Sequence, residues 1–155
     1  MKKYLIIFLT VLLFCGCNNT KEDNKELKTY NNYIDEVKKI DKSSEDIPFD
    51  ISLEFDRLTD KEIRYQVIID NVKEDINDIE AVMYHDLKTK DIFPSIGIFD
   101  EKQNLKVGQK PAGIILVGYI DYTGDINELK CKIKVLVKYK DSNNENKKVY
   151  YVTKK

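Results

Sequence analysis

The chain has 155 residues, with 26 Lys and Arg against 27 Asp and Glu, so its formal net charge is −1. A dedicated nucleic-acid-binding protein has a clear excess of basic residues, and this near-neutral balance therefore argues against that class. The length allows one domain with a buried core and is too short for two well-packed domains.

The first 16 residues have the pattern of a secretory signal. Lys2 and Lys3 precede an apolar run of eleven residues, 4–14, that only Thr10 interrupts. A permanent transmembrane helix needs about 20 apolar residues, so this run is too short to be one. We therefore expect residues 1–16 to be a helical signal peptide that is removed on export.

The end of this stretch resembles a bacterial lipobox. Gly16 precedes Cys17, and polar residues follow at once, while Phe14 and Cys15 depart from the usual lipobox residues. The resemblance implies a diacylglyceryl cysteine at Cys17, with palmitate-type acyl chains, in a lipoprotein on the outer, extracytoplasmic face of the cell membrane. Two acyl chains give stable attachment. Loss of Lys2 and Lys3 with the signal changes the formal charge to −3.

The three cysteines have different predicted fates. Cys15 leaves with the signal peptide and Cys17 carries the lipid, so Cys131 remains alone and no intramolecular disulfide is expected. Cys131 begins an alternating run, on its apolar side. We interpret it as a buried, unreactive thiol.

Residues 17–26 are polar and charged and predict a tether between the lipid and the folded domain. Residues 27–42 predict a short amphipathic helix, because Leu27, Tyr30, Ile34 and Val37 recur at helical spacing. Three roles remain open for this helix: docking on the domain, lying at the membrane surface, or forming a coiled-coil stalk.

From residue 48 to residue 155 the apolar positions recur every second residue. This pattern predicts an all-β domain, an antiparallel β-sandwich of about seven strands. The strands are expected at residues 49–56, 63–70, 79–85, 114–122, 130–140 and 148–153, with another short apolar piece inside the irregular section 86–113. Because the run 114–122 is apolar apart from Asp121, we expect it to be buried on both faces or to cross the sandwich.

The start of the strand 130–140 resembles the immunoglobulin fold. Asp125, Leu129 and Cys131 have the spacing of the aspartate, tyrosine and cysteine that open the sixth strand of that fold, with Leu129 in place of the tyrosine. The resemblance implies an immunoglobulin-like sandwich. In such a sandwich the strand 130–140 lies at the centre of its sheet, between the third and the last strands.

One face of this strand is rich in lysine. Lys130, Lys132, Lys134, Lys138 and Lys140 point away from Cys131, together with Leu136. Their expected outward neighbours are Glu80, Val82 and Tyr84 on one side, and either Tyr150 and Val152 or Val149 and Tyr151 on the other. The face either binds an anionic or protein partner, chiefly through Lys130, Lys132, Lys134, Lys138 and Tyr84, or is a solvated face whose lysines match nearby acids.

No motif for catalysis stands out. His85 is the only histidine, and the chain has neither a nucleophile elbow nor a glycine-rich phosphate loop. We therefore predict no enzyme, no metal site and no cofactor. The favoured function is a non-catalytic binding or structural module of the cell envelope, with an envelope or extracellular protein as partner.

Two alternative functions remain open. One is an immunoglobulin-like protease inhibitor that inserts the loop at residues 88–95 into an enzyme cleft. The other is an envelope copper carrier, because Met83 and His85 share one face of a strand and Cys131 offers a further soft ligand.

Overall fold

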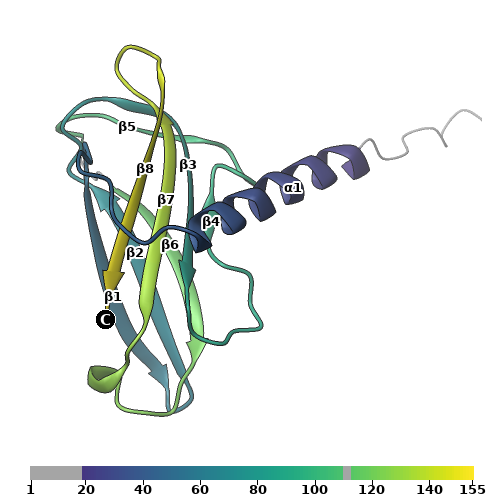
Figure 1. Cartoon of the computed structure of the whole chain (residues 1–155), viewed down its shortest axis with the longest axis vertical. Helices are drawn as coiled ribbons and strands as arrows, with labels where there is room; N and C mark the ends of the chain where they lie inside the picture. The colour runs from purple at the N-terminus through teal and green to yellow at the C-terminus, as the bar shows by residue number, and fades with distance from the viewer. Residues whose placement is uncertain (1–18, 110–112) are drawn as a thin grey trace, which may run out of the picture.

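The computed structural model describes residues 19–109 and 113–155. The predicted signal peptide at residues 1–16 and the predicted lipid site at Cys17 lie outside these residues. Two antiparallel sheets face each other, as the alternating sequence pattern predicted (Figure 1). The first sheet has the order β1–β2–β6, and the second has the order β4–β3–β7–β8, with β5 also paired to β3. The strands are β1 (Asp50–Thr59), β2 (Glu62–Asp70), β3 (Ile76–His85), β4 (Ser95–Ile96), β5 (Gln103–Leu105), β6 (Gly113–Asp121), β7 (Lys132–Lys140) and β8 (Asn146–Lys154).

The main core lies between the two sheets and is made by alternate residues of each strand. Ile63, Val67 and Ile69 of β2 face Ile133 and Val135 of β7, and all five are completely buried. The strand β7 is central in its sheet, between β3 and β8, as expected. Cys131 is buried in this core, which confirms its predicted placement.

The α-helix α1 (Asn19–Lys38) packs on the outer face of the second sheet. It begins eight residues before the predicted start at Leu27, so residues 19–26 are helical rather than a separate tether. Its first half projects beyond the edge of the sandwich (Figure 1). No helix among the described residues is both long enough and apolar enough to cross a bilayer.

The segment after α1 returns along the free edge of β8. The backbone N–H of Ser44 donates to the Tyr150 carbonyl at 2.9 Å, and the N–H groups of Tyr150 and Val152 donate to the hydroxyls of Ser44 and Ser43 at 3.0 and 2.9 Å. These bonds satisfy backbone groups that an edge strand otherwise leaves open. The chain then enters β1.

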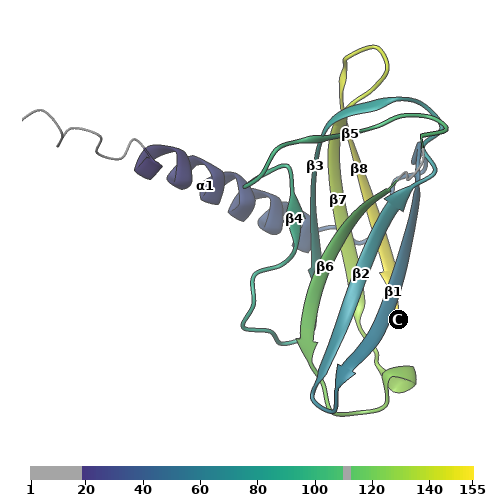
Figure 2. The ribbon, with the colours of Figure 1, turned by 180° about the vertical axis from the view of Figure 1, so that it is seen from behind.

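Of the two possibilities left open for the apolar run 114–122, burial on both faces is wrong. Residues of β6 alternate between buried and exposed, and Ile115, Val117 and Tyr119 point outward with 50%, 41% and 43% of their surfaces exposed. The strand is an edge of the first sheet, paired with β2 alone (Figure 2). The strand β6 is therefore an edge strand that also exposes apolar side chains on its outer face.

Gly118 of β6 leaves room for the Tyr65 ring on the neighbouring strand. The two residues are directly paired, and a Cβ atom on Gly118 would collide with the Tyr65 ring and hydroxyl. The ring has little freedom to move, because it is buried between Phe55 and His85. We expect Gly118→Ala to lower the free energy of unfolding by about 1–3 kcal/mol, a typical cost of overpacking.

Gly113 on the same strand is the matched control. An added Cβ there meets its neighbours at 3.6 Å or more, an ordinary contact. Urea unfolding should show a large difference between the two alanine variants. Equal stabilities would contradict the close packing of Tyr65 on Gly118.

Candidate functional site

A second, smaller core joins α1 to the sheet. Tyr30, Ile34 and Val37 of the helix are buried against Val82 of β3 and Leu136 of β7. The predicted amphipathic stripe thus faces the sheet, except that Leu27 is half exposed in the projecting part. Burying one such side chain completely contributes roughly 1.5–3 kcal/mol, so these contacts hold a helix that would be marginal alone.

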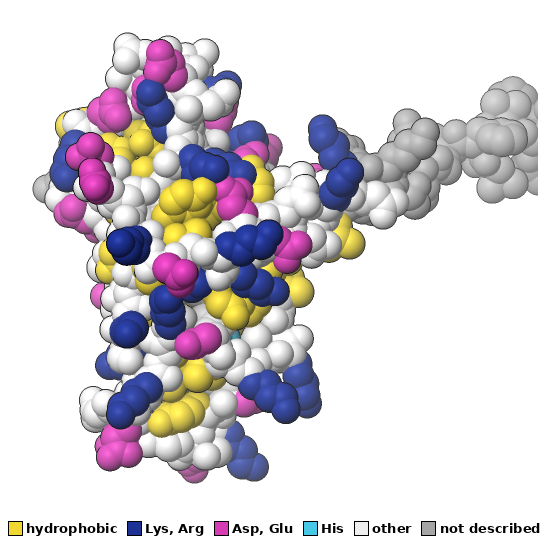
Figure 3. Space-filling model, viewed as in Figure 1, with side chains coloured by type: hydrophobic (Ala, Val, Ile, Leu, Met, Phe, Trp, Pro, Cys, Tyr) yellow, Lys and Arg dark blue, Asp and Glu magenta, His cyan; other side chains and the backbone are white. Residues whose placement is uncertain are grey.

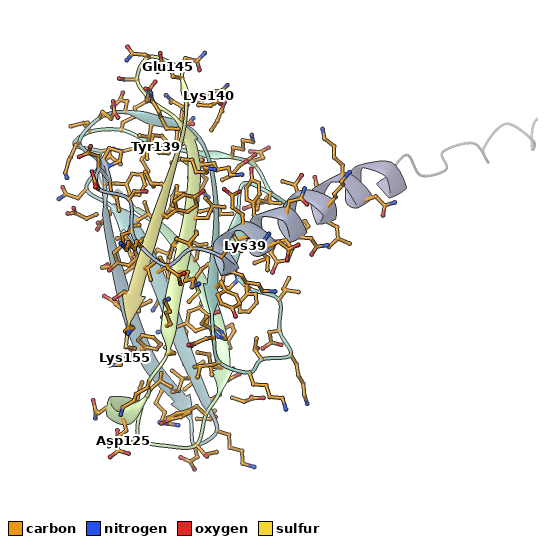
Figure 4. The ribbon with its side chains drawn as sticks, viewed as in Figure 1. Lys39, Asp125, Tyr139, Lys140, Glu145 and Lys155 are labelled. Carbon is orange, nitrogen blue, oxygen red and sulfur yellow. The ribbon has the colours of Figure 1, made fainter. Side chains whose placement is uncertain are left out.

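Lys134 binds the C-terminal end of α1. Its side chain is buried, and its Nζ donates to the Lys38 carbonyl at 2.5 Å. The last carbonyls of a helix have no partner within the helix and carry partial negative charge, so a buried ammonium group stabilises this end. Figure 4 shows Lys39, the next residue, over the middle of the sheet, far from the β7–β8 hairpin that Lys140 and Glu145 mark.

Glu36 binds α1 to the two last strands. Its carboxylate accepts hydrogen bonds from Lys148 Nζ and the Tyr150 hydroxyl, both at 2.7 Å, and pairs with Lys138 Nζ at 3.1 Å. Burial opposes ionisation of Glu36, but these three donors outweigh it and lower its pKa from 4.5 to about 2. The carboxylate is therefore ionised at neutral pH and held by two strands at once.

Tyr33 joins α1 to the other side of the same face. Its hydroxyl donates to Glu80 on β3, and the Lys138 ammonium lies 3.7 Å from the centre of its ring. Lys102 pairs with the same Glu80 carboxylate at 2.6 Å. Burial and the Glu80 carboxylate raise the pKa of Tyr33, so its hydroxyl remains protonated and acts as a donor.

Much of the predicted lysine face is therefore covered by α1 or paired within the chain. Lys132 pairs with Asp41 just after the helix at 3.1 Å, Lys134 is buried beneath its end, and Lys138 lies against Glu36 and Tyr33. The Lys132 ammonium lowers the pKa of Asp41 through a hydrogen bond. Figure 3 accordingly shows both charge signs interspersed over this face rather than one positive block.

The two remaining members of the predicted face have separate places. Lys130 precedes β7 and is exposed outside the helix contact. Tyr84 is half buried, with its ring 4.9 Å from that of Phe93 and the Lys38 ammonium 5.7 Å from its centre. Of the alternatives for β8, Tyr150 faces the helix and Val149 faces the main core.

The candidate copper ligands lie in the main core. Met83 is completely buried and His85 is 1% exposed, with its ring edge-on to Tyr65 and Phe93. Burial lowers the pKa of His85 against the opposing effect of nearby backbone groups and Asp86, and burial raises the pKa of Cys131 to about 11. Within residues 19–109 and 113–155, no three His, Cys, Asp or Glu side chains gather as metal ligands. A carrier that exchanges copper with partners needs accessible ligands, and this placement argues against that alternative.

The loop at residues 88–95 leaves the sheet after β3 and returns as β4. Ile92 is its most exposed apolar residue, at 78%, while the neighbouring Phe93 packs against Tyr84 and His85. The loop thus exposes the Ile92 side chain while Phe93 packs on the sheet. In the protease-inhibitor interpretation, Ile92 would enter the enzyme cleft.

Sequence reasoning missed the role of Glu36 and the open face of β6. A carboxylate beside Tyr33 and Val37, near the apolar stripe of a helix, is a signal that could have identified Glu36 as a partly buried contact. Comparisons with protein-family models, curated proteins and solved structures find no match.

We expect Glu36→Gln to loosen α1 at neutral pH. The neutral amide replaces charge-assisted hydrogen bonds, a loss of about 1.5–3 kcal/mol. Because the pKa of Glu36 is lowered on folding, its contribution is complete above pH 4.5 and declines as the pH falls toward 2. The difference in unfolding free energy between wild type and variant should therefore shrink over that interval.

Asp35→Asn is the matched control, because Asp35 is the exposed neighbour of Glu36 on the same helix. Amide hydrogen exchange in residues 30–38 should accelerate in Glu36→Gln and not in Asp35→Asn. Unchanged exchange in both variants would show that Glu36 does not hold the helix.

Proposed function

We propose that this protein is a lipoprotein anchored at Cys17 to the extracytoplasmic face of the cell membrane, and that its β-sandwich binds a protein of the envelope or cell exterior. The observation that carries the proposal is the docked helix. It begins at Asn19, two residues after Cys17, and is hydrogen-bonded to the sheet through Glu36 and Lys134. An anchor at Cys17 would therefore connect directly to a fixed arm.

The helix gives this arm a defined reach. Twenty helical residues rise about 30 Å, since each adds 1.5 Å. The contacts with the sheet use Tyr30 to Val37, so the first half of α1 stands between the anchor and the sandwich. The apolar face is occupied by the sheet. This supports a helix that docks on the domain over one that lies at the membrane surface or forms a coiled-coil stalk.

We further propose that the sandwich is immunoglobulin-like. Its sheet orders, β1–β2–β6 and β3–β7–β8, correspond to the orders A–B–E and C–F–G of the immunoglobulin fold. The short strands β4 and β5 add to the edge of β3. Asp125 begins a 3-10 turn (Ile126–Glu128) before β7, and Leu129 is buried where that fold has a tyrosine.

A binding role rather than catalysis is supported by where the reactive side chains lie. His85 and Cys131, the residues best suited to proton transfer or nucleophilic attack, are both core residues. Burial disfavours the imidazolium of His85 and the thiolate of Cys131. Neither side chain reaches a surface where a substrate would bind.

We expect Cys17→Ser to release the protein from the membrane. The serine hydroxyl cannot form the thioether to diacylglycerol, and so the mature chain would lack its acyl chains. Cell fractionation with metabolic labelling by a palmitate analogue measures both attachment and modification.

Cys131→Ala provides the control, because it removes the buried thiol of the domain and leaves Cys17 in place. This variant should remain labelled and membrane-bound. Membrane retention of Cys17→Ser, or label that depends on Cys131, would contradict lipid attachment at Cys17.

A further inference from the structure

The four long edges of the two sheets are protected to different degrees. The edge of β3 carries β4 and β5, and the edge of β8 is hydrogen-bonded by Ser43 and Ser44. The edge strand β1 alternates acidic residues outward and has an irregular register between Arg57 and Thr59. Short added strands, bound loops, charges and irregular pairing are all devices that prevent edge-to-edge association.

The edge of β6 has none of these protections among the described residues. Its residues from Gly113 to Ile120 carry no charge, and it pairs with β2 in one unbroken register over nine residues. The outward side chains Ile115, Val117 and Tyr119 are exposed, and Ile68 of β2, which is opposite Ile115, extends the apolar surface. Figure 2 shows β6 as the outermost strand of its sheet.

The backbone groups on this edge can be assigned. Tyr122 N–H donates to the Lys61 carbonyl at 2.8 Å, which fixes this pair as hydrogen-bonded. In an antiparallel ladder, bonded pairs alternate, so Ile114, Leu116, Gly118 and Ile120 point their backbone groups toward β2. The N–H and C=O groups of Ile115, Val117 and Tyr119 therefore point to the open edge, beside their own exposed side chains.

We propose that β6 pairs antiparallel with β6 of a second copy of this chain, making one continuous six-stranded sheet. A two-fold axis at Val117 uses the whole strand: Val117 lies opposite its own copy, and Ile115 lies opposite Tyr119. In both pairs the backbone N–H and C=O groups point across the open edge toward the other copy, so the two strands can hydrogen-bond. The outward side chains form a continuous apolar strip, and no like charges oppose each other between Ile114 and Ile120.

Self-pairing fits β6 better than pairing with a charged peptide, because the strand is uncharged and its own complement. If the lipid anchor of the proposed function is present, confinement to one membrane raises the effective concentration of copies. A short edge contact that is weak in solution then becomes populated. The pairing itself needs only β6, so it can be tested with and without the anchor.

The direct test is cysteine crosslinking in intact cells that carry the full chain. Val117→Cys should give a covalent dimer on oxidation, whereas Ser52→Cys, an exposed outward position on the other edge of the same sheet, should not. Running both variants also in a Cys17→Ser background separates the two proposals. A Val117 dimer in released protein would support self-pairing even where membrane anchoring has failed.

A charge-swap experiment tests whether the strand that pairs with β6 comes from a second copy of the chain. Val117→Lys and Val117→Glu should each lower dimer formation by about tenfold or more, because like charges meet at the two-fold axis. Co-expression of the two variants should restore a mixed dimer, since Lys then faces Glu. Ser52→Lys should have no effect.

Three results would overturn the proposal. The first is the absence of a Val117→Cys dimer in both backgrounds, and the second is an equal yield from Ser52→Cys. The third is that co-expression of the Lys and Glu variants fails to restore pairing. If the first result comes with a crosslink from Val117→Cys to a different protein, the edge belongs to a foreign strand.

Discussion

The structure depends on one constraint, which is that the outer face of the second sheet has an apolar centre that must be covered. Val82 and Leu136 lie at this centre and are completely buried in one cluster with Tyr30, Ile34 and Val37 of α1. The lysines around them would repel one another on a bare sheet, and α1 supplies Glu36 and its C-terminal carbonyls as counter-charges. The helix α1 and the lysine-rich face of β7 are therefore the two sides of one interface. This interface fixes the direction in which the chain leaves the sandwich toward its N-terminus, and it covers much of the lysine-rich surface of β7.

Much of this architecture could be predicted from periodicity. The alternation from Cys131 to Lys140 identified the strand β7 and the side that it turns to the main core, and the spacing of Tyr30, Ile34 and Val37 identified the buried side of the helix. The position of β7 between β3 and β8 was implied by the resemblance to the immunoglobulin fold rather than by periodicity. Periodicity describes one element at a time, however. It could not show that the helix and the lysine face bind each other, because that depends on Glu36 meeting Lys148 and Tyr150, more than 100 positions away.

The misinterpreted strand shows a second limit. In the run from Ile114 to Ile120 the outward positions are as apolar as the inward ones, so no alternation distinguishes an edge strand from one buried on both faces. Residue type alone suggested burial, and the sheet order reveals that no sheet or helix of the described residues covers Ile115, Val117 and Tyr119. His85 illustrates the reverse case. A residue type associated with chemistry lies between aromatic rings in the core, where burial keeps it neutral.

The two outer faces of the sandwich thus differ in what they can do: one is closed by the chain itself, and the other ends in an open apolar edge. The central claim is that α1 is a fixed arm, and a distance measurement between its projecting half and the sheet tests this most directly. Spin labels at Lys28→Cys and Lys154→Cys, both exposed positions on α1 and β8, should give a single narrow distance distribution in pulsed electron resonance. A broad distribution, extending to the separations of a helix swinging freely from residue 39, would contradict the account.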